Sequence, residues 1–313
     1  MDAPVVFLIF NRPDLTERVF AAIAQARPRR LLVVADGPRH AAEAELCAQT
    51  RRIATAVDWD CELVTEFSDV NLGCKRRVIS GIDRAFELWD EAIILEDDCL
   101  PHPSFFPYCA ELLERYRDDE RIMTISGDQF MPERFQGYGY SYLFTRYVSI
   151  WGWATWRRAW RLYDGEMSLW PKVRESQAFV DRIQPPLRRL RMFNNWDRMA
   201  RGEVDTWDFQ WQFACLRQYA LTIRPRVNLV SNIGFRPDAT HTVNPSPVAD
   251  RDVEDLAFPL KHPLTFVPDS GLEMAEHAYA VKHEWHGLSP WIRFKRIVRF
   301  PWIPWLESKR RRA

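Results

Sequence analysis

Three adjacent carboxylates, Glu96, Asp97 and Asp98, follow the apolar residues 93–95, and the turn 101–103 reads Pro-His-Pro. An apolar run of this kind predicts a buried strand, so the acids leave the core at its carboxyl end. Adjacent negative charges repel one another unless a cation or a hydrogen-bonded ligand offsets them. Mg²⁺ and Mn²⁺ prefer oxygen ligands and typically bridge one or two carboxylates to substrate phosphates. The run therefore predicts a divalent metal that holds a phosphate-bearing substrate, and an acidic turn in solvent is the alternative.

The composition is that of a folded protein with one large domain or two closely packed halves. The 313 residues are 47% hydrophobic and 27% charged, which is enough to bury a substantial core. The formal net charge is zero, so nothing supports a nucleic-acid partner. The six cysteines form no CxxC pair, as expected of reduced thiols in a cytosolic protein. The chain enters a strand at once, without the basic and apolar regions of a signal peptide. We therefore expect a cytoplasmic location.

The first third of the chain alternates between apolar strands and helices. Strands are predicted over 5–10, 31–35, 62–66 and 92–95, and helices over 15–25, 41–56, 78–87 and 104–117. This alternation is typical of a parallel sheet covered by helices. Ligands of such sheets bind at the carboxyl ends of the strands.

Polar residues follow each of these four strands. Asn11 and Arg12 follow the first, Asp36 the second, residues 71–77 the third and residues 96–98 the fourth. Loops are polar in any protein, but the matched presence of acids and bases at four strand ends favours one shared cleft.

The composition of the sequence changes from about residue 137. Residues 137–160 are rich in Gly and aromatic side chains, with a strand-like run at 140–150. A helix is predicted from about 205 to 219 and a strand at 227–230. Residues 236–270 contain six prolines and are expected to form a long loop that would suit a lid over a bound donor.

In this order, the motifs resemble those of GT-A-type nucleotide-sugar glycosyltransferases. The match is to bacterial, family 2-like enzymes and, more distantly, to the N-acetylglucosaminyltransferase I group. It covers about residues 4–240. The residues that carry it are Phe10-Asn11-Arg12-Pro13, Ala35-Asp36-Gly37, Asn71-Leu72-Gly73, Leu95-Glu96-Asp97-Asp98, Trp151-Gly152-Trp153 and Trp207-Asp208.

The resemblance implies an α/β fold of the GT-A (Rossmann-like) type, with a mostly parallel central sheet flanked by helices. Residues 1–135 would form the nucleotide-sugar-binding half and residues 136–270 the acceptor-binding half of the same domain. The basic stretch 166–203 is expected to be a helical insertion. Residues 271–313 would form an extended C-terminal tail.

The resemblance also assigns roles in binding the donor. Asp36 would meet the base, expected to be uracil, and Asn11 and Arg12 the nucleotide or its phosphates. Glu96 and Asp97 would face the ribose and the donor sugar. Further candidates for the diphosphate are Lys75, Arg76 or Arg77. An aromatic rim for a sugar and core packing are the two alternatives for Trp151, Trp153 and Trp156.

For the metal, the resemblance implies Asp98 as the direct ligand, Asp97 beside it and His241 as a weaker candidate. Mn²⁺ or Mg²⁺ would stabilise the departing nucleoside diphosphate as a Lewis acid. An inverting transfer also needs a carboxylate that takes the proton of the acceptor hydroxyl. Asp208 matches that base best. Asp205 is its rival, although it could be only the N-cap of the helix that contains Asp208.

The C-terminal residues 289–313 carry eight cations and one anion, Glu307, interleaved with Trp, Phe and Ile. Such a segment suits the surface of an anionic membrane. A tail packed on the protein itself and an RNA-binding arm are the alternatives.

Together these features predict an inverting, metal-dependent hexosyl- or N-acetylhexosaminyltransferase. It would move a sugar from a nucleoside diphosphate, expected to be UDP, to a saccharide or lipid-linked acceptor in polysaccharide assembly at the inner membrane face. A sugar-nucleotide nucleotidyltransferase is one alternative, but the Gly-rich phosphate loop it would need after the first strand is missing. A non-catalytic, membrane-associated assembly protein is the other, and the retained acids speak against it.

Overall fold

The computed structural model describes residues 1–236 and 249–286. The chain divides into two compact units, Met1–Ser270 and Gly271–Ala313. Helix α10 (Ser270–His286) is the element described at the start of the second unit. The candidate metal ligand His241 and the basic tail 289–313 lie outside the described residues.

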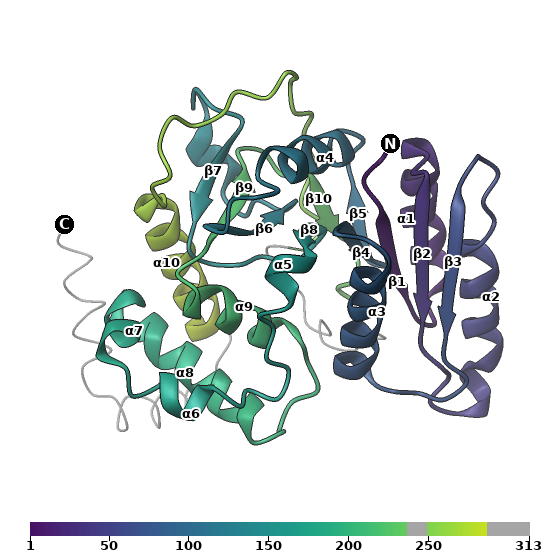
Figure 1. The fold of residues 1–313 in the computed structure, drawn as a ribbon, viewed down its shortest axis with the longest axis horizontal. Coiled ribbons are helices and arrows are strands. Elements are labelled where there is room, and N and C mark those ends of the chain that lie inside the picture. The colour runs from purple at the N-terminus through teal and green to yellow at the C-terminus, as the bar shows by residue number, and fades with distance from the viewer. Residues whose placement is uncertain (237–248, 287–313) are drawn as a thin grey trace. The chain divides into compact units, whose positions relative to one another are not determined.

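The first unit is built around a sheet of eight strands in the order β3-β2-β1-β4-β8-β6-β9-β7 (Figure 1). Six of the strands run in one direction, and β8 and β7 run in the other. The strand bounds are β1 Val5–Ile9, β2 Arg30–Ala35, β3 Glu62–Phe67, β4 Glu91–Glu96, β6 Ile122–Ser126, β7 Tyr142–Thr145, β8 Trp153–Trp156 and β9 Leu221–Pro225. The predicted mostly parallel sheet is confirmed.

The register of the central strands brings their carboxyl ends to the same edge. Leu8 of β1 lies opposite Glu96 of β4, and Ile9 lies opposite Ala35 of β2. The residues that follow these strands therefore emerge side by side, where ligands of parallel sheets bind.

Helices cover both faces of this sheet, because alternate strand residues point to opposite sides. Val5 and Phe7 pack in the cluster that includes α1 and α4, and Val6 and Leu8 pack in the cluster that includes α3 and α9. The helix bounds are α1 Pro13–Ala26, α2 Ala44–Ala54, α3 Cys74–Leu88, α4 Phe105–Arg115, α5 Arg157–Trp160 and α9 Asp208–Arg217, with 3-10 turns at Ala41–Glu43 and Pro132–Phe135.

The predicted insertion contains three helices, α6 Trp170–Val173, α7 Gln177–Arg182 and α8 Pro186–Ala200. They enclose a separate apolar cluster that includes Trp170, Trp196 and, from α9, Phe213. Through Phe213, this cluster contacts α9, whose first residue is the candidate base Asp208.

Two predicted strands in the second half have the wrong bounds. The run 140–150 is a strand only over β7, and the strand expected at 227–230 is replaced by β9 before it and by β10 (Val230–Asn232) after it. Strand β10 pairs with β5 (Cys99–Pro101), directly after the acids. The Arg and Pro in β9 mask its strand pattern. Arg224 is buried there and lies against Asp128, so tertiary contacts override the local pattern.

The described part of the Pro-rich stretch, residues 249–269, forms no helix or named strand. Hydrogen bonds nevertheless join this stretch to the rest of the first unit. Leu256 N donates to Ser104 Oγ at 3.2 Å, and Lys261 N donates to Ser141 Oγ at 2.8 Å. In the described ranges, no helix has the length and apolar character needed to cross a bilayer.

Candidate active site

A cavity of about 530 Å³ lies at the edge where β1, β2 and β4 end. Its lining includes residues after those strands, the start of α3 and the segment 204–209 that leads into α9. Both predicted halves of the first unit therefore contribute to it. The volume falls in the range of pockets that bind small ligands.

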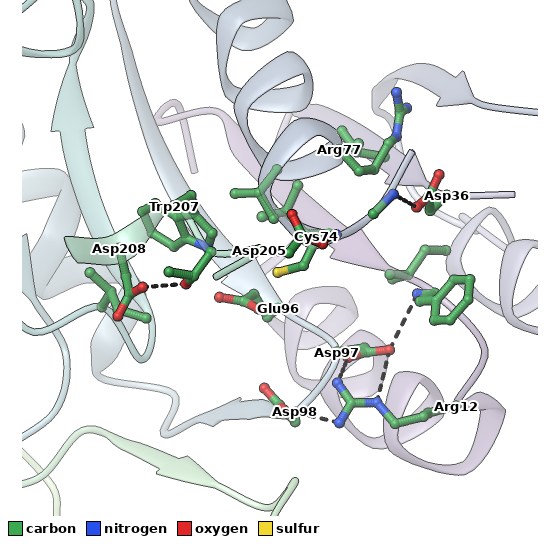
Figure 2. Close-up of a pocket in the computed structure, with 18 of the residues that line it drawn as sticks. Arg12, Asp36, Cys74, Arg77, Glu96, Asp97, Asp98, Asp205, Trp207 and Asp208 are labelled. Carbon is green, nitrogen blue, oxygen red and sulfur yellow. Dashed lines mark hydrogen bonds and ion pairs between the residues drawn. The ribbon is translucent and has the colours of Figure 1, made fainter. Parts of the chain in front are cut away.

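Arg12 lines the cavity and bridges two of the three acids (Figure 2). Its guanidinium pairs with Asp97 through Nη2 and with Asp98 Oδ2 through Nη1 at 3.1 Å. Burial opposes the charge of Arg12, but the two carboxylates outweigh it and raise the pKa. Arg12 thus supplies part of the positive charge that offsets the three carboxylates at 96–98.

Asp97 is committed to this pairing. Both of its oxygens accept from Arg12, and Oδ2 also accepts from Phe10 N at 3.4 Å. Burial raises the pKa of Asp97, although Arg12 acts in the opposite direction. Its place in the structure is to hold the β1–α1 connection, so it is a poorer metal ligand than the sequence predicts.

Glu96 and Asp98 present carboxylates to the cavity. Burial and the charges of Asp98 and Asp97 raise the pKa of Glu96 to about 8. No hydrogen-bond partner of the Glu96 side chain lies among the described residues. Asp98 packs against Gly234, where a Cβ would come within 2.2 Å of Asp98 Oδ2, so only glycine fits there.

These two carboxylates fit a hard divalent cation. No cluster of three or more His, Cys, Asp or Glu side chains suited to a metal occurs within residues 1–236 and 249–286. Mg²⁺ and Mn²⁺ need only one or two carboxylates when phosphate oxygens complete the shell. Burial is the largest cause of the raised pKa of Glu96, and the charges of Asp98 and Asp97 add to it.

Asp36 holds the turn that precedes α3. Its carboxylate accepts from Leu72 N at 2.9 Å, from Gly73 N at 3.0 Å and from Asn71 Nδ2 at 3.1 Å. Asp36 is buried and lines the cavity, as does Asn71. Asp36, which is predicted to contact the nucleobase, therefore has a second role, which is to shape the wall of the cavity.

Asn11 does not line the cavity. Its Nδ2 donates to Glu43 Oε1 at 3.1 Å, and Arg39 binds the same carboxylate through its backbone N at 2.9 Å. Arg39 does line the cavity, with its guanidinium 5.3 Å from the centre of the Phe10 ring. Arg39 was missed in the sequence, where the only signal is a cation soon after the second strand.

Of the three cations at the start of α3, only Arg77 lines the cavity. Lys75 forms an ion pair with Glu166 at 2.9 Å, and Arg76 is exposed. Arg77 donates to Glu66 O, and burial lowers its pKa. The cations that sequence reasoning offered for a diphosphate are thus largely engaged elsewhere.

Asp205 and Asp208 also line the cavity; in Figure 2 Asp205 lies beside Cys74, and Asp208 lies on the other side of Glu96 from Arg12. Asp205 accepts from the first amides of α3, so it caps that helix and not the helix α9 that the sequence suggested. Asp208 begins α9 and accepts a hydrogen bond from Thr206 Oγ1. Its charge contributes to the raised pKa of Glu96, which places the two carboxylates in electrostatic contact.

The tryptophans divide between the core and the cavity. Trp153 is 1% exposed and stacks on Trp207 with ring centres 5.5 Å apart. Trp156 is also buried. Trp151 is half-buried and lines the cavity. Of the two interpretations offered for these tryptophans, burial therefore favours a core role for Trp153, whereas Trp151 lines the cavity. Cys74 also lines the cavity and was not predicted.

Comparisons with known proteins show similarity at the level of the fold. No family model and no curated protein matches the sequence. Among solved structures, UDP-glucose pyrophosphorylase complexed with UDP-glucose is 8% identical, with a TM-score of 0.30 over 52% of this chain and 79% of that one. Mouse xyloside xylosyltransferase 1 is 10% identical, with a TM-score of 0.33 over 69% and 81%. The bifunctional glycosyltransferase WbbM is 11% identical, with a TM-score of 0.30 over 69% and 37%. Likeness this remote says nothing about the reaction, which must be argued from the cavity.

Proposed function

We propose that this chain is a metal-dependent glycosyltransferase that moves a sugar from a UDP-sugar to a saccharide or lipid-linked acceptor with inversion. The observation that carries the proposal is the arrangement of the cavity. Glu96 and Asp98 face it from the end of β4, and Asp208 faces it from the other half of the unit. A donor bound between them would have a cation on its diphosphate and a base on the far side of its sugar.

The acid side of the cavity suits the leaving group. A divalent cation held by Asp98 and Glu96 would offset the charge that develops on the departing diphosphate. Arg12 holds Asp98 in place and lowers the repulsion among the acids. The raised pKa of Glu96 favours its protonated form in the empty cavity, and a neighbouring cation would favour the ionised form.

The α3 side of the cavity is less suited to the diphosphate. The amino end of a helix is normally a favourable place for phosphate. Here Asp205 already accepts from the amides of Cys74 and Lys75. A dianionic diphosphate would have to displace this carboxylate, so the acid side with its cation is the better site.

The alternatives are weaker on structural grounds. The β1–α1 connection consists of Phe10, Asn11 and Arg12, so it offers no glycine-rich cradle for the phosphates of a nucleotidyltransferase substrate. A non-catalytic assembly protein has no need of an ordered cavity with acids on both walls. A protein that shows no transferase activity would favour this alternative.

The proposal is tested by titrating UDP into the full chain in a calorimeter, with and without Mn²⁺, and by measuring UDP release from UDP-glucose, UDP-galactose and UDP-N-acetylglucosamine. Asp98→Ala should abolish the effect of Mn²⁺ on binding. Asp208→Asn should spare binding and lower turnover about 10²- to 10⁴-fold. Asp118→Asn, on the exposed surface, is the matched control. Failure of UDP to bind with Mn²⁺ would refute the proposal.

We also propose that the basic tail 289–313 brings the enzyme to an anionic membrane, where lipid-linked acceptors reside. The support is its sequence, in which eight cations alternate with aromatic residues. The full chain should co-sediment with vesicles that contain phosphatidylglycerol and not with pure phosphatidylcholine vesicles. A chain truncated after residue 286 should lose this binding, and equal binding by both chains would refute a role for the tail.

A further inference from the structure

Asp205 links the segment before α9 to a helix far away in the sequence. Its Oδ2 accepts from Cys74 N at 3.0 Å and its Oδ1 from Lys75 N at 3.1 Å. These amides belong to the first turn of α3, where no intrahelical acceptor exists. Gly73 at the N-cap of α3 has no side chain to cap the helix, so a carboxylate 130 residues further along the chain supplies the cap.

The contact depends on glycine at position 73. Gly73 has a φ of 81°, a conformation that residues with a Cβ rarely adopt. A Cβ at this position would also come within 2.7 Å of Asp205 Oδ2. The backbone of the turn is therefore shaped so that the carboxylate can approach closely.

Other contacts at this junction are weaker or do not involve α3. Lys75 pairs with Glu166, but the Glu166 side chain is 86% exposed, and exposed ion pairs contribute little. Tyr163 Oη donates to Trp207 O at 3.0 Å, which holds the segment 204–209 without touching the helix. The two hydrogen bonds of Asp205 join this segment directly to the backbone of α3.

Asp208 follows Asp205 by three residues, and both line the cavity. We propose that Asp205 is a positioning residue: by capping α3 it fixes the segment 204–208 and holds Asp208 opposite Glu96. This inference rests on the proposed function, in which Asp208 is the base. It gives Asp205 a structural task in place of the role of rival base, since both of its oxygens accept from amides of α3.

Two substitutions separate positioning from proton transfer. Asn has one acceptor oxygen, so it can keep one of the two hydrogen bonds to α3 but cannot take up a proton, whereas Ala can do neither. Turnover is measured as UDP release from the three UDP-sugars named above, and affinity as the Kd of UDP with Mn²⁺. Asp205→Ala should lower kcat roughly 10- to 100-fold with an unchanged Kd. Asp205→Asn should lower kcat clearly less than Asp205→Ala, because one hydrogen bond of the cap remains.

Glu166→Gln is the matched control, because it breaks the exposed ion pair at the same junction and leaves the cap intact. Its kcat should equal that of the wild type. Hydrogen exchange gives a readout that does not depend on activity. Asp205→Ala should speed the exchange of residues 74–77 and 204–208, and Asp205→Asn should speed it less.

Each outcome decides the inference. If Asp205→Asn were as inactive as Asp205→Ala while UDP still bound, Asp205 would be the base and the inference would fail. It would also fail if both variants matched the wild type. A wild-type protein that releases no UDP would instead refute the proposed function, and hydrogen exchange would still decide whether Asp205 joins the two segments.

Discussion

Replacing Glu96 by Gln should make the stability of the protein less dependent on pH. The pKa of Glu96 is raised from 4.5 to about 8 by burial and by the neighbouring Asp98 and Asp97. Between these two values the folded protein therefore holds a proton that the unfolded chain has released. Stability from this group is fully present below pH 4.5 and is lost as the pH rises toward 8.

The magnitude follows from proton linkage. One proton of difference corresponds to about 1.4 kcal/mol per pH unit. Wild-type stability should thus lose up to this amount per unit between roughly pH 5 and pH 7.5, on the order of 3–4 kcal/mol in all. Glu96→Gln carries no charge at any pH, so its advantage over the wild type should grow with the same slope and level off above pH 8.

The assay is urea unfolding of both proteins at half-unit steps from pH 5 to pH 9, without divalent metal. Glu17→Gln on the exposed surface of α1 controls for the loss of one negative charge. Saturating Mn²⁺ and UDP should flatten the wild-type slope, because a cation beside Glu96 favours its ionised form. A difference between wild type and Glu96→Gln that stays constant across this range would refute the reasoning.

Arg12→Gln should destabilise the fold by about 3–5 kcal/mol at pH 7, because it leaves buried Asp97 without its counter-charge. The loss should shrink at low pH, where Asp97 is protonated, and a loss that does not depend on pH in urea unfolding would contradict this account. Trp153→Ala should cost about 3–5 kcal/mol, since the indole is part of the core. Trp153→Phe should cost clearly less, because it keeps an aromatic ring beside Trp207 and removes an indole N–H that has no partner among the described residues. If either Trp153 variant weakened UDP binding while fully folded, the ring would belong to the donor site after all.

Local patterns in the sequence were sufficient for the sheet and for the acid wall of the cavity. Apolar runs of four to six residues predicted β1, β2 and β4, since buried parallel strands need apolar side chains on both faces. The residues that follow those strands had to emerge at one edge because the strands are parallel. This explains why the sequence alone predicts that Arg12, Asp36 and Glu96 line the same cavity.

Which of these polar groups meet one another was decided by the tertiary structure. Arg12 reaches Asp97 across 85 positions, and Asp205 caps a helix 131 positions away, so neither contact leaves a local signature. The same holds for the aromatic motif, in which Trp151 lines the cavity and Trp153 enters the core. Hydrogen bonds and burial depend on distances between elements, whereas periodicity and turn chemistry act within one element. The sequence alone therefore determined the kinds of residue at the site, and the packing of distant elements decided which of them remain available to a ligand.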